Sequence, residues 1–424
     1  MAQAASSRRS PAPFIALSIV VGGLLALALA WVLASDGSEG LISGSIMLAF
    51  GAGWALMAWL TTRYSGQPQR WLSVPATALA GVGLALALLQ PGPGLMDLLG
   101  WIWPIALAVL AVWMFMQLRR QLHGFGRVLV GGLTVALLLI AIAGGIMTVE
   151  TAASPASSAG RLVDIGGRSL YLECAGSGGP AVILQAGAGG SSTAWARIAP
   201  EVARTTTVCS YDRAGRGRSD NPPAPQDGEA IAKDLHDLLT NAGVPGPYVF
   251  VGHSSGGPYL RVFAAAYPAD VAGMVLIDPQ PATAFTSLPS YPSIYEYLKL
   301  SGGLAPSLAR IGLLGPIFGV APAEATADVA ISYRDEIRML PKALEQAAKV
   351  TSVGDVPLII VSAGIESQQG WSAAQDAQAS LSTNVAHRTI PGSTHDTLLE
   401  ADSGASVEAI LDVLAAVKEG TPVD

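Results

Sequence analysis

Lysine is absent from the first 150 residues, and charged residues of any kind are scarce there. Seven arginines and four acidic residues give this part a net charge of +3, whereas the whole chain carries −7, so the remainder carries −10. An acidic globular part lacks the basic face that nucleic acid requires, and we expect no nucleic-acid partner. The length of 424 residues allows two or three domains.

Cysteine is equally scarce, since only Cys174 and Cys209 occur. The sequence contains no C-x-x-C or H-E-x-x-H spacing of the kind that binds metal. Neither cysteine is placed as a nucleophile. We therefore expect no metal site and no cofactor.

Long apolar runs dominate the first part of the chain. A helix needs about 20 apolar residues to cross a bilayer, and none of these runs shows a polar face or contains a charged residue. Membrane transport paths usually keep such charges, so an anchor or packing scaffold is the better interpretation. Residues 1–150 are thus predicted to form an all-α membrane domain, with the lipid bilayer as its partner. The five predicted spans are residues 13–34, 41–61, 72–90, 98–118 and 128–149.

The arginines of this part indicate its orientation. Cytoplasmic loops carry an excess of Lys and Arg, so the N-terminus is expected in the cytoplasm and everything after residue 150 outside it. A cleaved signal peptide is the alternative for the first span, but its apolar run is too long and further spans follow. The arginines precede the first span (Arg8, Arg9), follow the second (Arg63, Arg70) and follow the fourth (Arg119, Arg120, Arg127).

A small, polar stretch at 151–160 is typical of a flexible linker. From 161 to 424, short β-like runs alternate with helical patterns, which predicts a mainly parallel sheet with helices on both faces. A hairpin is expected at Gly166-Gly167, and a last helix near 405–418. The expected strands are 161–165, 169–174, 181–184, 206–211, 248–251, 274–277 and 358–362.

One motif in this domain carries chemistry. Gly252-His253-Ser254-Ser255-Gly256 follows a strand-like run and precedes a helical pattern, which is the layout of a nucleophile elbow. The glycines are needed because a Cβ on either side of the serine would collide with its neighbours. The turn lifts the Ser254 hydroxyl clear of the sheet and points the Ser255 amide at the reaction site.

Together with the elbow, three further stretches resemble the α/β-hydrolase family of bacterial serine hydrolases. They are the loop around Gly187, the turn at 211–220 (YDRAGRGRSD) and Gly392-Ser393-Thr394-His395. The resemblance covers about residues 161–420 and implies a mostly parallel eight-stranded sheet flanked by helices. It also implies a cap at about 280–354. The apolar residues of this segment favour short helices with an apolar inner face. The expected location is the bacterial cytoplasmic membrane, with the hydrolase domain outside.

A serine needs a base to remove its proton and an acid to hold that base. The family order of serine, acid and histidine places the base at His395, since His253 lies within the elbow itself and His236 and His387 have structural surroundings. Two residues compete for the role of the acid. Glu366 follows a late strand at the family's usual location but departs from its Gly-x-x-Asp pattern, whereas Asp278 ends the preceding strand, where some relatives place the acid.

The resemblance also implies two amide donors for the oxyanion of acyl transfer. Ser255 supplies one of them, and Ala188 supplies the other when the loop is matched on Gly187. Gly187 and His253 are expected to contact the substrate. The family strand order places Cys174 and Cys209 on neighbouring strands. They could form a disulfide or remain two free buried thiols, and we favour the disulfide because the domain is expected outside the cytoplasm.

These observations predict a membrane-anchored serine hydrolase that cleaves a carboxylic ester or related acyl bond in a small or lipid-like substrate. The serine argues against the epoxide hydrolases and dehalogenases of this fold, which use an aspartate nucleophile. An acyltransferase with the same triad is one alternative. A membrane sensor with a hydrolase-like pocket is another, although it would not need the base. The sequence gives no basis for an oligomeric state.

Overall fold

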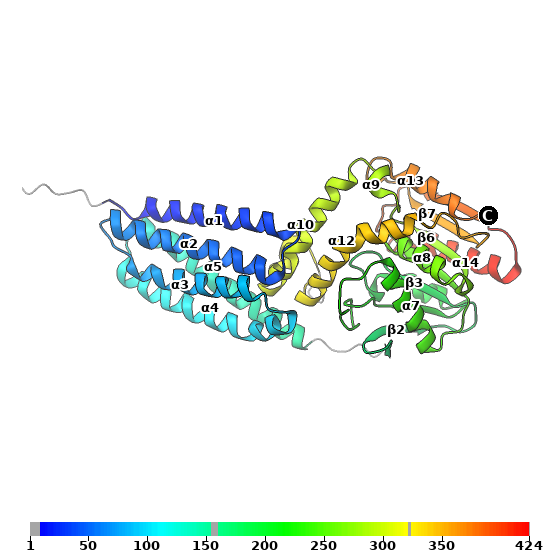
Figure 1. The fold of residues 1–424 in the computed structure, drawn as a ribbon, viewed down its shortest axis with the longest axis horizontal. Helices are drawn as coiled ribbons and strands as arrows, with labels where there is room; N and C mark the ends of the chain where they lie inside the picture. The colour runs from blue at the N-terminus through cyan, green and yellow to red at the C-terminus, as the bar shows by residue number, and fades with distance from the viewer. Residues whose placement is uncertain (1–8, 154–159, 321–323, 424) are drawn as a thin grey trace, which may run out of the picture. The chain divides into compact units, whose positions relative to one another are not determined.

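The computed structural model describes residues 9–153, 160–320 and 324–423. The chain forms two compact units (Figure 1). The first unit comprises Met1–Ser154 together with Lys299–Ile331, and the second comprises Pro155–Leu298 together with Ser332–Asp424. Each unit has its own hydrophobic core, and each is described separately below.

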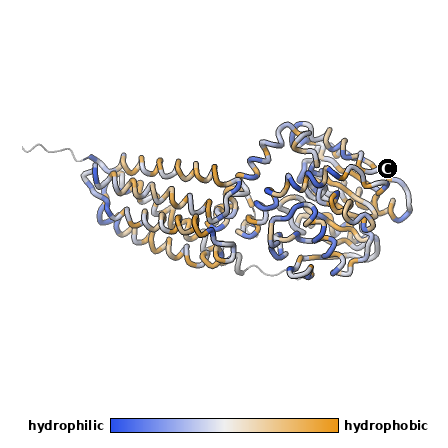
Figure 2. The backbone as a smooth tube through the Cα atoms, in the orientation of Figure 1, coloured by the Kyte–Doolittle hydropathy of each residue, from blue (hydrophilic) through white to orange (hydrophobic). Residues whose placement is uncertain are grey.

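The first unit contains the five predicted apolar helices, and all five are long and apolar enough to cross a membrane. Figure 2 shows that these helices are apolar along most of their length, as expected for segments that face lipid. The fifth helix continues to Ala153, into the predicted linker, whose residues 154–159 lie outside the described part of the chain. The helices are α1 (Ala12–Ala34), α2 (Glu39–Tyr64), the 3-10 turn η1 (Arg70–Leu72) with α3 (Ser73–Leu89), α4 (Pro93–Gln121) and α5 (Phe125–Ala153).

Helix α2 is the central helix of this unit. Half of its most apolar window is buried, against 22% in each of the other four helices. Glycines allow its neighbours to approach closely, because a Cβ added to Gly22 of α1 would lie only 3.0 Å from the Cα of Gly53. On the α3 side, a Cβ on Gly44 would lie 2.5 Å from the backbone oxygen of Gly83. Small residues are the usual means of close helix packing in membranes.

Part of the predicted cap belongs to the first unit. The cap contains α9 (Ala284–Ser287), α10 (Tyr291–Arg310), α11 (Leu314–Phe318) and α12 (Ala327–Ala348). The prediction of short helices was therefore wrong for α10 and α12. Pro292 lies in the first turn of α10, where its missing N–H is not needed, and the helix continues through Pro306.

The second unit is built on one eight-stranded sheet with the strand order β1-β2-β4-β3-β5-β6-β7-β8. Strands β1, β2 and β4 pair antiparallel, and all pairs from β4 to β8 are parallel. The predicted mostly parallel sheet is confirmed. The strands are β1 (Arg161–Asp164), β2 (Ser169–Ala175), β3 (Val182–Gln185), β4 (Val208–Tyr211), β5 (Tyr248–His253), β6 (Val271–Ile277), β7 (Leu358–Ala363) and β8 (Val385–Ile390).

Helices cover both faces of this sheet. Side chains of one strand alternate between the faces, so Phe250 of β5 enters one buried cluster while Val249 and Val251 enter the other. Phe263 of α8 packs with the first cluster and Val413 of α14 with the second. The remaining elements are η2 (Ser192–Trp195), α6 (Ala199–Val202), α7 (Gly228–Ala242), α8 (Gly256–Ala266), η3 (Pro268–Asp270), α13 (Trp371–Gln378), η4 (Ala379–Leu381) and α14 (Ser403–Glu419).

A disulfide joins Cys174 and Cys209, as the sequence predicted. The two cysteines are directly opposed partners in the antiparallel pair of β2 and β4, with their Cα atoms 4.1 Å apart. Cys209 is fully buried. The bond therefore ties the antiparallel edge of the sheet to its parallel centre.

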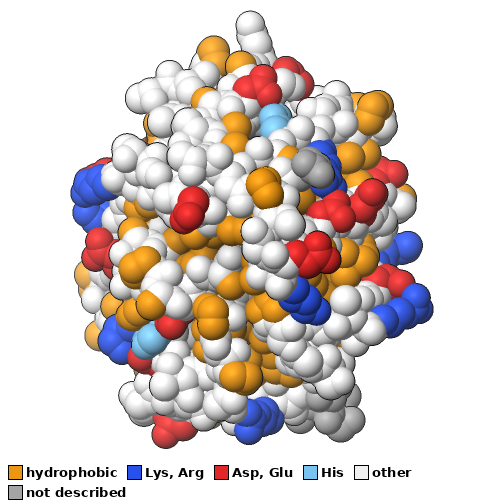
Figure 3. All heavy atoms as spheres, turned by 90° about the vertical axis from the view of Figure 1, so that its right-hand side faces the viewer, with side chains coloured by type: hydrophobic (Ala, Val, Ile, Leu, Met, Phe, Trp, Pro, Cys, Tyr) orange, Lys and Arg blue, Asp and Glu red, His pale blue; other side chains and the backbone are white. Residues whose placement is uncertain are grey.

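Charge is mixed on the face of the molecule seen in Figure 3. Acidic side chains are interspersed with Lys and Arg across this face, and apolar side chains gather toward its middle. The excess acidic residues of the chain therefore form no single acidic patch on the face shown.

Candidate active site

Ser254 lies at the turn between β5 and α8, where the sequence predicted the elbow. Its φ of 54° is in the left-handed region that residues other than glycine rarely adopt, so the turn is strained. A Cβ on Gly256 would lie 2.4 Å from the backbone oxygen of Gln185, and one on Gly252 would lie 2.8 Å from Leu260. Both positions therefore exclude side chains, as the motif requires.

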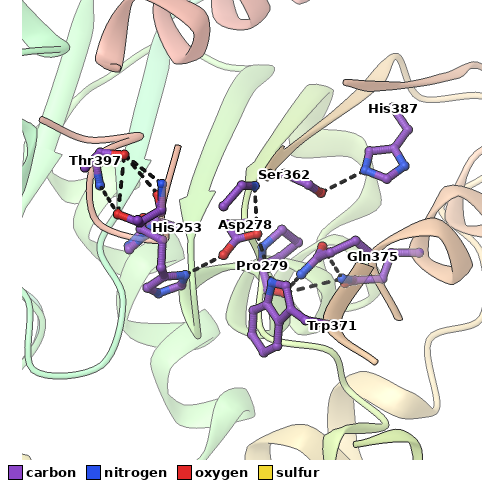
Figure 4. A network of polar contacts seen from close by, with 12 residues as sticks. His253, Asp278, Pro279, Ser362, Trp371, Gln375, His387 and Thr397 are labelled. Atoms are coloured by element: carbon purple, nitrogen blue, oxygen red, sulfur yellow. Dashed lines mark hydrogen bonds and ion pairs between the residues drawn. The ribbon is translucent and has the colours of Figure 1, made fainter. Parts of the chain in front are cut away.

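His395 and Asp278 are in direct contact. The Nδ1 atom of His395 lies 2.6 Å from Oδ2 of Asp278, which follows β6 and is fully buried. The other carboxylate oxygen accepts hydrogen bonds from the Ala363 N–H at 3.2 Å and from Nε1 of Trp371 at 2.9 Å. Asp278 lies at the centre of this network (Figure 4). A histidine that donates from Nδ1 to a carboxylate keeps Nε2 available to accept a proton.

Glu366, the other candidate acid, lies elsewhere. Its side chain is exposed, and its carboxylate accepts a hydrogen bond from the Ser372 N–H at 3.3 Å. The structure thus brings Asp278 rather than Glu366 to His395. Asp278 also has a left-handed φ of 40°, so a second strained residue stands beside the elbow.

His253 supports the loop that carries His395. Its Nε2 atom donates to the backbone oxygen of His395 at 3.1 Å, and the two rings lie 4.5 Å apart. Burial, reinforced by the neighbouring His395, lowers the pKa of His253 to about 3. His253 is therefore neutral at ordinary pH and serves as a donor rather than as a base.

The other two histidines of this unit have partners away from the elbow. His236 contacts Asp270 at 3.0 Å and stacks on Tyr267. His387 of β8 bonds to Ser362 at 2.8 Å and to Asp376 at 3.0 Å. These contacts are typical of histidines with a structural role.

The loop that is expected to supply the second amide donor lies directly against the serine. A Cβ added to Gly187 would lie 2.9 Å from Cβ of Ser254. Ala188 and Ser255 line the same cavity, with Ser255 at the start of α8. Both residues expected to supply amide donors therefore lie beside Ser254 at the same cavity.

A cavity of about 750 Å³ opens above the elbow, within the range of small-molecule sites. Ser254, His395, Gly187 and His253 all line it. Its apolar lining includes four cap residues, Ile294, Leu298, Ile337 and Leu340, and also Leu399 of the sheet domain.

Trp371 is a member of the site that the sequence did not predict. It is buried at the start of α13, and its indole N–H is one of the two donors to Oδ1 of Asp278. A single tryptophan after a loop has no sequence signal that distinguishes it from a core residue. Only the contact with Asp278 reveals its position.

Comparison with known proteins agrees with this fold. Residues 180–301 match a family model described as the alpha/beta hydrolase fold. The Bacillus subtilis protein YqjL is 34% identical over 116 residues, which cover 27% of this chain and 46% of YqjL. The chain spans less than half of the length of the curated relatives that it matches.

Solved structures show the same fold at low sequence identity. The Cif epoxide hydrolase of Acinetobacter nosocomialis is 15% identical with a TM-score of 0.54, covering 64% of this chain and 96% of its own. The lip1 protein of Acinetobacter baumannii is 18% identical with a TM-score of 0.52, covering 62% of this chain and 92% of its own. These matches establish the architecture, and the chemistry has to be argued from the site.

Proposed function

Because the C-terminal part of this chain has an α/β-hydrolase fold, we propose that the protein is a membrane-bound serine hydrolase. It cleaves a carboxylic ester or related acyl bond, with Ser254 as nucleophile, His395 as base and Asp278 as acid. One observation carries the proposal: a serine on a strained elbow and an Asp-paired histidine line a single cavity. Serine at this position supports acyl chemistry rather than the aspartate-based chemistry of epoxide opening.

The first half of the reaction forms an acyl-enzyme. Ser254 Oγ attacks the carbonyl carbon while Nε2 of His395 takes its proton, and the buried carboxylate of Asp278 stabilises the resulting imidazolium. The N–H groups of Ala188 and Ser255 donate to the oxyanion. The intermediate then collapses, and His395 gives its proton to the departing alcohol oxygen.

Water completes the cycle. His395 removes a proton from a water molecule, whose oxygen attacks the acyl carbon. The second tetrahedral intermediate releases the carboxylic acid and returns the proton to Ser254. The balance is one ester and one water consumed for one acid and one alcohol.

Two features support the location and the substrate class. The arginine distribution of the first 150 residues and the disulfide of the second unit both favour a hydrolase domain outside the cytoplasm. The apolar wall of the cavity favours a hydrophobic acyl or alcohol group.

The test uses the full chain in detergent with p-nitrophenyl esters of increasing acyl length. Ser254→Ala should lower kcat by about 10⁴-fold or more and abolish labelling by a fluorophosphonate probe. Ser255→Ala is the matched control, because it removes a neighbouring hydroxyl but keeps the backbone N–H, and it should stay within a few-fold of the native protein. Equal rates for the native chain and Ser254→Ala would contradict the proposal.

A further inference from the structure

A buried ion cluster lies beneath the loop that carries the second amide donor. Glu336 of α12 contacts Arg213 at 2.7 Å and Arg216 at 2.6 Å. All three side chains are less than 10% exposed. Charges that are this deeply buried persist only when each is paired and hydrogen-bonded.

Within the oxyanion loop, the Gly190 N–H donates to the backbone oxygen of Gly187 at 3.1 Å. Residues 186–190 read Ala-Gly-Ala-Gly-Gly and carry no polar side chain. Arg213 donates to the backbone oxygens of Ala186 at 2.6 Å and Gly187 at 2.7 Å. Glu336 accepts the Gly189 N–H at 3.0 Å. The ion cluster thus fixes three backbone groups on both sides of Ala188.

The direction of the Ala188 N–H follows from these contacts. The carbonyl of Gly187 and the N–H of Ala188 belong to one planar trans peptide, in which they point in opposite directions. Because Arg213 holds the carbonyl, the N–H points away from Arg213, and Ala188 lines the cavity. A rotation of this peptide would turn the donor away from the oxyanion.

We propose that Glu336 is a positioning residue, which orients the Ala188 N–H through Arg213 and through the Gly189 N–H and so couples the cap helix to the oxyanion hole. This inference rests on the proposed function. Glu336 belongs to α12, the helix that also supplies Ile337 and Leu340 to the cavity wall. Displacement of this helix removes the contacts of Glu336 with Arg213 and with the Gly189 N–H.

The charge on Glu336 is permanent under working conditions. Burial alone would raise its pKa, but Arg213 and Arg216 outweigh that effect and hold the pKa at about 2. Tyr259 adds a further hydrogen bond to the same carboxylate at 3.1 Å. Glu336 does not touch the reacting atoms, so its contribution is to pre-organisation, which is where an oxyanion donor gains its effect.

The experiment compares Glu336→Gln with Glu345→Gln in the full chain in detergent. Glu345 is the matched control, since it lies on the same helix but is exposed and pairs with Lys349. Loss of one oxyanion donor costs about 10²–10³ in kcat, so we expect a fall of at least tenfold for Glu336→Gln, with KM within threefold. The Ki of an alkylboronic acid, whose tetrahedral adduct occupies the oxyanion hole, should rise by a similar factor.

A purely structural role predicts a different result. Glu336→Gln would then lower the melting temperature and the amount of folded protein, but kcat per labelled Ser254 and the boronic acid Ki would stay within twofold of native values. That outcome overturns the inference. If Glu336→Gln does not accumulate, the same measurements on Arg213→Lys decide, because a lysine keeps the charge but lacks the planar fork that places two separate nitrogens on the Ala186 and Gly187 carbonyls.

The two proposals fail in distinguishable ways. If Ser254→Ala is as active as the native chain, the proposed function fails. If Ser254→Ala is inactive but Glu336→Gln and Arg213→Lys keep a native kcat, only the positioning role fails.

Discussion

Nδ1 of His395 and Oδ2 of Asp278 lie 2.6 Å apart, although the two residues are separated by 117 positions in the chain. The carboxylate is fully buried and has two further donors, from Ala363 and Trp371. These three contacts orient the carboxylate toward the imidazole. This contact distinguishes Asp278 from Glu366, which the elbow motif alone does not.

The first prediction concerns the acid. Asp278→Asn should lower kcat by about 10⁴-fold, because the amide cannot stabilise the imidazolium and favours the wrong tautomer. Glu366→Gln, the matched control, should stay within threefold, since Glu366 is exposed and contacts only the Ser372 N–H among the hydrogen bonds described. Steady-state kinetics on one p-nitrophenyl ester will measure kcat for both variants. A fall in kcat in Glu366→Gln alone would assign the role of the acid to Glu366 instead.

The second prediction concerns pH and His253. Its pKa is about 3 in the folded chain against an ordinary value of 6.5. Between these values the unfolded chain binds a proton that the folded chain does not, so stability falls as the pH is lowered from 6.5 toward 3. One proton sets a slope of at most about 1.4 kcal/mol per pH unit.

The measurement is the apparent melting temperature of the full chain in detergent between pH 7 and pH 4. His253→Gln keeps a donor for the His395 carbonyl but does not titrate, and its melting temperature should depend less steeply on pH. His236→Gln is the matched control, because it replaces a partly exposed histidine that is bonded to Asp270. Identical slopes in all three proteins would exclude a contribution from His253.

The third prediction concerns Arg310 in the first unit. Its guanidinium bonds to Glu39 at the start of α2 and to Asp97 of α4, the latter at 2.8 Å, and both Arg310 and Glu39 are largely buried. Arg310→Gln leaves the Glu39 carboxylate buried without its cation, which costs about 3–5 kcal/mol. The apparent melting temperature should fall by about 5 °C or more.

Arg388→Gln provides the comparison for this pair. Arg388 pairs with Asp412 at 2.6 Å, but both side chains are substantially exposed, and such pairs contribute about 1 kcal/mol or less. Its melting temperature should change by no more than about 2 °C. Equal shifts for Arg310→Gln and Arg388→Gln would show that the buried pair adds nothing to the packing of residues 299–331.

Local sequence patterns were sufficient to predict the architecture. The five apolar runs, the alternating strands of the second unit and the glycines around Ser254 each depend on residues that are close in the chain. A hydrophobic run reflects the transfer of apolar side chains from water. The two-residue period of a strand and a tight turn follow from local backbone geometry. For this reason they predicted the apolar helices, the mostly parallel sheet and the position of the elbow.

Contacts between distant residues were beyond those patterns. Asp278 and Glu366 are both acids near strand ends, and only the packing of β6 against β7 and of α13 on Asp278 brings one of them to His395. Glu336 is one acid among several in α12, and its burial between two arginines depends on where that helix lies on the sheet domain. Likewise, the segment Lys299–Ile331 belongs to the first unit, where Arg310 pairs with Glu39 and Asp97, partners that are distant in the sequence. A strand end or a helix face is determined by neighbours in sequence, whereas the partner of a buried charge is selected by the tertiary packing that excludes water around it.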